Sequence, residues 1–140
     1  LPIGKGLMKR EGSKVAILNF GTLLGSALKA GEQLDATVVD MRFVKPIDES
    51  LIRQLAENHQ LLVTLEENSV AGGAGAAVSE FLAAQGIVMP VMHLGLPDCF
   101  VDHGKHSEQL TDTGLDSANI LQSIEQRLEI LKTAGQVAQI

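Results

Sequence analysis

The chain has 140 residues, 45% hydrophobic and 20% charged, a balance typical of a globular domain rather than a disordered or fibrous chain. This length favours a single domain with one continuous core. With 17 acidic and 11 basic residues, a net charge of −6, no Trp, no Tyr and four Phe, it lacks the positive charge and stacking surfaces that nucleic-acid binding requires.

Cysteine content and hydropathy indicate the compartment. The single cysteine, Cys99, excludes an internal disulfide, and no charged leader followed by an apolar run opens the chain. No apolar run approaches the roughly 18 residues that cross a bilayer. We therefore expect a cytoplasmic protein without membrane association. The opening Leu-Pro-Ile-Gly lacks an initiator Met, which is consistent with a piece of a longer protein.

The first half of the chain alternates between short apolar runs and helical spacing. Residues 15–21 (VAILNFG) and 36–41 (ATVVDM) are typical of strands buried on both faces. Between them, leucines and alanines at helical spacing predict a helix over residues 22–35. After the second strand, Asp48 is placed to cap a helix that should run to about His59.

The second half repeats this alternation. Residues 60–67 (QLLVTLEE) predict a third buried strand, a glycine turn begins a helix through residues 76–82, and residues 90–96 (PVMHLGL) predict a fourth strand. A long amphipathic helix is expected after Asp116. Because crossovers between parallel strands are right-handed, the pattern predicts an open sheet with helices on both faces.

The glycine turn after the third strand is a candidate anion site, because helix N-termini favour negative charge. A dinucleotide-binding fingerprint, however, needs Gly or Ala where this chain has Val78, and no Gly-Lys-Ser or Gly-Lys-Thr occurs. A carboxylate of Glu66 or Glu67 about 4 Å from a phosphate would oppose it by about 1–4 kcal/mol, more than the about 0.3–1 kcal/mol from the helix. We therefore expect a tightly packed turn, with the glutamates hydrogen-bonded or solvated, and keep a bound anion as the alternative.

Two further groups of polar residues have alternative interpretations. Arg42 and Lys45 follow the second strand, so they either face an anionic group or pair with surface acids such as Asp48. His59 and His93 are expected to be a helix-end residue and a strand residue.

The segment GLPDCFVDHGKH gathers potential ligands for a metal. Cys99, His103 and His106 lie near Asp98 and Asp102, but their spacing does not match a zinc signature and no CxxC is present. We predict no metal here and interpret the segment as a loop at an interface or at the rim of an active site. General acid–base work by His103 stays open.

The order of these motifs resembles the C-terminal domain of the 1-deoxy-D-xylulose-5-phosphate synthases over about residues 1–131. The blocks VAILNFGT, VVDMRFVKPID and LLVTLEENSVAGGAGAAVSEFL are also similar to transketolases and to the beta subunits of 2-oxo acid dehydrogenases. LGLPDCFVDHG and the later TGLD favour the synthases. A transketolase or dehydrogenase domain is the alternative within the same enzyme class.

This resemblance implies an α/β fold, a three-layer α/β/α sandwich on a five-stranded mixed sheet. The short segment 6–10 would form an antiparallel strand that the apolar pattern does not predict. The domain is expected over residues 1–133, with residues 134–140 as a frayed tail.

The resemblance also implies a thiamine diphosphate enzyme that joins pyruvate, with loss of carbon dioxide, to glyceraldehyde 3-phosphate in isoprenoid precursor synthesis. In that family the cofactor and Mg²⁺ are held by the preceding domains, through a Gly-Asp-Gly motif with a downstream Asn and through a glutamate. This chain has no Gly-Asp-Gly. We therefore expect thiamine diphosphate and Mg²⁺ in the full-length enzyme but no cofactor, metal or catalysis in this chain alone.

By resemblance, the domain packs against the N-terminal and middle domains of its polypeptide and against the second subunit of a homodimer. The candidate interface residues are Arg42, Lys45, Glu67, Asn68, Gly72, Gly73, Gly75, Asp98, Phe100 and His103. The alternative from another class is a self-standing α/β module that binds a small anion at the glycine turn or beside Arg42 and Lys45.

Overall fold

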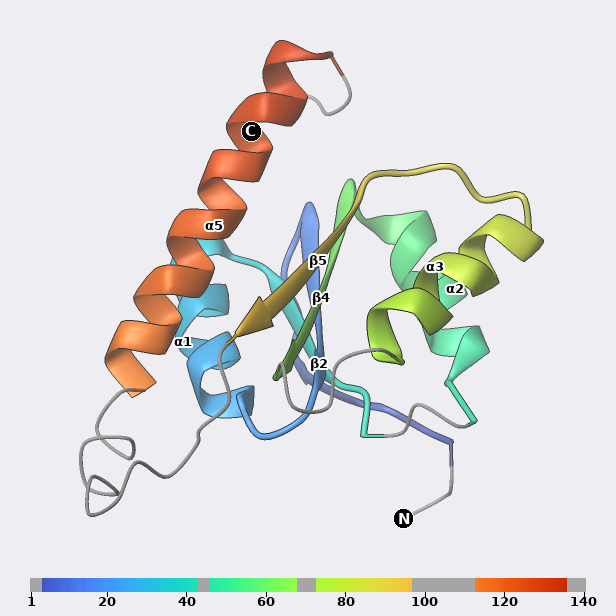
Figure 1. The fold of residues 1–140 in the computed structure, drawn as a ribbon, viewed down its shortest axis with the longest axis horizontal. Helices are drawn as coiled ribbons and strands as arrows, with labels where there is room; N and C mark the ends of the chain where they lie inside the picture. The colour runs from blue at the N-terminus through green and yellow to red at the C-terminus, as the bar shows by residue number, and fades with distance from the viewer. Residues whose placement is uncertain (1–3, 43–45, 68–72, 97–112, 136–140) are drawn as a thin grey trace.

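The computed structural model describes residues 4–42, 46–67, 73–96 and 113–135, which form an α/β fold around one sheet (Figure 1). In chain order the strands are β1 (Leu7–Arg10), β2 (Val15–Phe20), β3 (Thr37–Asp40), β4 (Leu61–Glu67) and β5 (Val91–Leu96). Their order across the sheet is β1-β3-β2-β4-β5, with β1 antiparallel to β3 and the other neighbours parallel. The sheet is therefore five-stranded and mixed.

Helices cover both faces of the sheet. Those in the described part of the chain are α1 (Leu24–Leu34), α2 (Glu49–Asn58), α3 (Ala74–Ala84) and α5 (Thr113–Thr133). In Figure 1, α1 and α5 lie on one side of the strands and α2 and α3 on the other. None of these helices is both long enough and apolar enough to cross a bilayer.

The strands direct alternate side chains into two hydrophobic clusters, one on each face. Ile17 and Val63 pack beneath α1 and α5, whereas Leu18 and Leu62 pack beneath α2 and α3. All six residues of β2 are buried because this strand is central and both its faces are covered. That burial explains why its sequence, VAILNF, is apolar at every position except Asn19 and does not alternate.

A hydrogen-bonded cluster joins the amino end of the sheet to α2. Thr37 Oγ1 accepts a hydrogen bond from the Gly12 N–H at 2.9 Å and lies 2.7 Å from His59 Nε2. His59 Nδ1 lies 2.8 Å from the carbonyl oxygen of Leu55. Since a carbonyl only accepts, Nδ1 carries the proton, and Nε2 accepts from the Thr37 hydroxyl. His59 directly follows α2, so its prediction as a helix-end residue is confirmed.

The four strands predicted from apolar runs are present, with ends that differ by at most one residue. The last helix begins at Thr113, earlier than the expected start after Asp116. The fifth strand, β1, is the antiparallel strand that the resemblance implied. It is an edge strand with exposed Met8 and Lys9 at its centre, so it has no apolar run for a pattern to detect.

Candidate functional site

The carboxyl ends of parallel strands meet at one edge of the sheet, where open α/β sheets commonly bind ligands. Here β4 ends at Glu67, Arg42 follows β3, and Gly73 and Gly75 lie at the start of α3. The structure therefore brings these four predicted residues to the same edge. Only the backbone of Glu67 is described, and Arg42 is exposed in a left-handed conformation with φ of 66°.

The first turn of α3 is capped by a carboxylate from the preceding strand. Glu66 Oε2 accepts a hydrogen bond from the backbone N–H of Gly75 at 2.9 Å, and Glu66 is buried, with 8% of its surface exposed. The N-cap residue, Gly73, has no side chain that could accept this bond. A negative charge thus already occupies the helix N-terminus, where an anion would otherwise bind. The prediction of a hydrogen-bonded glutamate is confirmed for Glu66.

Gly75 is explained by the close approach of α3 to β5. A Cβ atom at this position would lie 2.7 Å from Nδ1 of His93 on β5. His93 also lies between two hydroxyls, with Nδ1 2.7 Å from Thr64 Oγ1 on β4 and Nε2 2.8 Å from Ser79 Oγ on α3. The predicted tight packing of the turn is therefore confirmed at Gly75, and His93 is a strand residue as predicted.

Val78 occupies the helix–sheet contact where a dinucleotide-binding turn requires a small residue. Its side chain is fully buried in the cluster beneath α2 and α3. The branched side chain fills the space that close helix–strand packing around a pyrophosphate would need. The contact between α3 and the sheet at Val78 is therefore part of the hydrophobic core.

Asp48 is a buried helix cap, so its description as a surface acid available to Arg42 or Lys45 is wrong. Only 7% of Asp48 is exposed. Its Oδ1 accepts from the Leu51 N–H at 3.2 Å, which confirms the predicted cap of α2, and its Oδ2 accepts from the Gly6 N–H at 2.9 Å. Both carboxylate oxygens of Asp48 therefore accept hydrogen bonds from backbone N–H groups.

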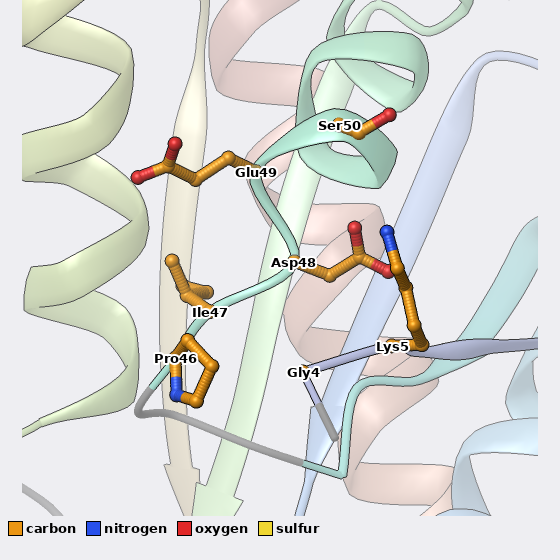
Figure 2. A pocket seen from close by; sticks show the side chains of 7 residues that line it. All are labelled: Gly4, Lys5, Pro46, Ile47, Asp48, Glu49 and Ser50. Atoms are coloured by element: carbon orange, nitrogen blue, oxygen red, sulfur yellow. The ribbon is translucent and has the colours of Figure 1, made fainter. Parts of the chain in front are cut away.

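A hollow of about 650 Å³ lies beside this cap, where the segment entering β1 meets the start of α2 (Figure 2). It is lined by Gly4, Lys5 and residues 46–50. In Figure 2 the Glu49 side chain points away from Asp48. Because the two Asp48 oxygens already accept backbone hydrogen bonds, we assign no ligand to this hollow.

Several predicted site residues lie outside the described residues, and the interface assigned to them stays a prediction. The predicted interface residues concerned are Lys45, Asn68, Gly72, Asp98, Phe100 and His103. The same holds for Cys99, Asp102 and His106 of the loop that was considered as a metal cluster.

Sequence reasoning assigned no role to Thr64, Ser79 and His93, which the structure joins by hydrogen bonds. His93 is 29 residues from Thr64 and 14 from Ser79. Pairing of β4 with β5 sets Thr64 beside His93, and packing of α3 adds Ser79. The one sequence signal is Thr64 itself, a polar residue inside an apolar run.

The sequence matches known proteins over almost its whole length. The family described as "Transketolase, C-terminal domain" matches residues 4–120. The 1-deoxy-D-xylulose-5-phosphate synthase of Stutzerimonas stutzeri (strain A1501) is 59% identical over 134 residues, which cover 96% of this chain and 21% of that protein. The synthase of Pseudomonas aeruginosa (strain LESB58) is 58% identical over 127 residues, covering 91% and 20%. The chain thus spans about a fifth of the length of these relatives.

The fold is also found among solved structures. A structure titled "Split gene transketolase, inactive beta4 tetramer" matches with a TM-score of 0.72 and 33% sequence identity, covering 90% of this chain and 43% of that one. This match confirms the predicted α/β fold with its mixed five-stranded sheet.

Proposed function

The chain belongs to the transketolase C-terminal domain family, and on that basis we propose that it is the non-catalytic C-terminal domain of a 1-deoxy-D-xylulose-5-phosphate synthase. The observation that carries the proposal is identity of 55–59% to proteins of this name over 96% of the chain but only 21% of their length. A segment of this size corresponds to one domain of a larger enzyme.

The enzyme carrying this domain is proposed to transfer a two-carbon unit from pyruvate, with loss of carbon dioxide, to glyceraldehyde 3-phosphate. Thiamine diphosphate would supply the carbanion chemistry and Mg²⁺ would hold its diphosphate. The residues of this chain do not fit the cofactor. The Gly-Asp-Gly motif is missing from the sequence, and at the N-terminus of α3 the Glu66 carboxylate takes the position that a diphosphate would need. Both groups would therefore bind in other domains.

The role of this domain would be to pack against the N-terminal and middle domains and against the second subunit of a homodimer in the cytoplasm. Hydrogen bonds between α3 and the sheet support this role, since Glu66 on β4 accepts from Gly75 at the start of α3 and His93 on β5 pairs with Ser79 further along the helix. The candidate interface residues are Arg42, Lys45, Glu67, Asn68, Gly72, Gly73, Gly75, Asp98, Phe100 and His103.

The activity is tested on the full-length protein that carries this sequence. We expect product from pyruvate and glyceraldehyde 3-phosphate only when thiamine diphosphate and Mg²⁺ are added. The 33% identity to the split gene transketolase supports a second candidate for the activity, a transketolase-type reaction with a ketose donor. If the full-length protein turns over a ketose phosphate, or pyruvate with lipoamide, but not pyruvate with glyceraldehyde 3-phosphate, the synthase proposal is wrong.

The isolated chain provides a second test. Titration with thiamine diphosphate and Mg²⁺ in a calorimeter is expected to give no binding heat at micromolar concentrations. Phosphate or nucleotides at millimolar concentration are expected to leave the melting temperature unchanged. A clear upward shift would favour the anion-binding module instead.

A further inference from the structure

The two edge strands of the sheet differ in how their outer sides are protected. β1 (LMKR) carries Lys9 and Arg10 and has an irregular register between Met8 and Arg10. Charges and bulges of this kind prevent a free edge from pairing with another strand. β5 (VMHLGL) has no Lys, Arg, Asp or Glu. Its edge thus has none of the charged residues that protect β1.

The outer side of β5 offers backbone groups to a further strand. The Pro90 carbonyl accepts from the Leu62 N–H at 3.2 Å, so Pro90 faces β4. Backbone groups alternate along a strand, and those of Val91, His93 and Gly95 therefore face away from β4. Across the ranges that the structure describes, no strand pairs with this side of β5.

An apolar groove of about 540 Å³ adjoins this edge. Its walls come from the second half of α3, the turn after it and the start of β5, and the lining residues are Ser79, Leu82, Ala83, Gly86, Ile87, Val88, Met89 and Val91. Val91 belongs to both the groove and the edge, so the two surfaces are continuous. Val88 is 97% exposed, which leaves a large apolar side chain uncovered.

Ser79 places a polar group in the wall of this groove. Its Oγ is held 2.8 Å from His93 Nε2, and the other ring nitrogen is held by the fully buried Thr64. A hydroxyl has one donor and two acceptor positions, so Ser79 keeps capacity for further hydrogen bonds beside the one with His93. A peptide group of a partner fits that need.

We propose that the outer edge of β5 and the adjoining groove bind an extended segment from the rest of the same polypeptide, which adds a strand to the sheet and places an apolar side chain in the groove. This inference rests on the proposed function, in which the chain is one domain of a longer enzyme. The relatives have about four-fifths of their length outside the matched region, which can supply such a segment. A segment tethered to the domain also has a far higher effective concentration than a second molecule.

The first test is amide hydrogen exchange in the full-length enzyme and in this chain. The Val91 and His93 amides are expected to exchange at least about tenfold more slowly in the full-length enzyme. Equal, fast exchange in both would overturn the proposal. Protection that appears in this chain only as it self-associates at higher concentration would assign the edge to a second copy instead.

The second test compares two exposed apolar positions in the full-length enzyme. Val88→Glu is expected to lower its melting temperature by several degrees, whereas Ile130→Glu, on α5 and 61% exposed, changes it little. Equal effects of the two substitutions would contradict the proposal. Product formation is measured separately, so a protected β5 edge without synthase activity would overturn the proposed function alone.

Discussion

At the scale of single residues, the Thr37 hydroxyl links three parts of the chain. It accepts from the Gly12 N–H and donates to His59, whose other nitrogen is fixed by the Leu55 carbonyl. Thr37→Val would leave both partners without a hydrogen bond at a site that is 1% exposed, and we expect a loss of about 1–3 kcal/mol in the free energy of unfolding. Urea denaturation measures this loss in the free energy of unfolding. Thr37→Ser, which keeps the hydroxyl, should lose clearly less, and equal losses would argue against this role.

Gly75 and Gly25 form a matched pair of helical glycines. A Cβ at Gly75 would meet His93 at 2.7 Å, whereas nothing lies within 4 Å of a Cβ at Gly25. We expect Gly75→Ala to destabilise the fold by about 1–3 kcal/mol through overpacking, and Gly25→Ala to be neutral or stabilising by up to about 1 kcal/mol. Thermal unfolding compares the stabilities of the two variants.

The contact with His93 can be isolated by a double-mutant cycle. In a His93→Ala background, the cost of Gly75→Ala should fall because the overlapping ring is removed. An unchanged cost would mean that another contact requires the glycine.

At the scale of elements, the first turn of α3 donates a backbone hydrogen bond to a carboxylate on β4. Glu66→Ala removes the acceptor for the Gly75 N–H, and we expect a loss of about 0.5–2 kcal/mol in the free energy of unfolding. Glu66→Gln retains an acceptor oxygen and should lose less. The amides in the first turn of α3 should exchange faster in Glu66→Ala than in the parent chain. If their exchange is unchanged, Glu66 does not hold this turn.

At the scale of the whole molecule, α5 completes one of the two cores. Ile120, Ile124, Leu128 and Leu131 are buried against the sheet and α1. Burial of each side chain contributes about 1.5–3 kcal/mol, and the net stability of a typical domain is only about 5–15 kcal/mol, so the fold should not withstand the loss of all four. Deleting residues 113–140 should abolish cooperative unfolding, measured by circular dichroism.

Truncation after the helix is the control. α5 ends at Thr133, and its last buried residue is Leu131. Removing residues 134–140 should change the free energy of unfolding by less than about 0.5 kcal/mol. A larger loss would extend the proposed domain boundary beyond residue 133.

The amino-acid sequence alone determined the order of the secondary structure elements of this protein. A strand buried on both faces is mostly apolar, as β2 is with Asn19 as its one polar residue, and a capping carboxylate must precede its helix, as Asp48 does. These are local requirements, so they can be recognised from neighbouring residues. The tight packing predicted for the glycine turn is confirmed at Gly75, which lies against His93.

Only the tertiary structure decided which distant residues meet. The contacts of His93 with Thr64, Ser79 and Gly75 depend on the pairing of β4 with β5 and on the docking of α3. The position of β1 at the sheet edge, and the free outer side of β5, also follow from strand order. Strand order is set by the burial of both sheet faces at once, an energy summed over the whole core that no short stretch of sequence contains.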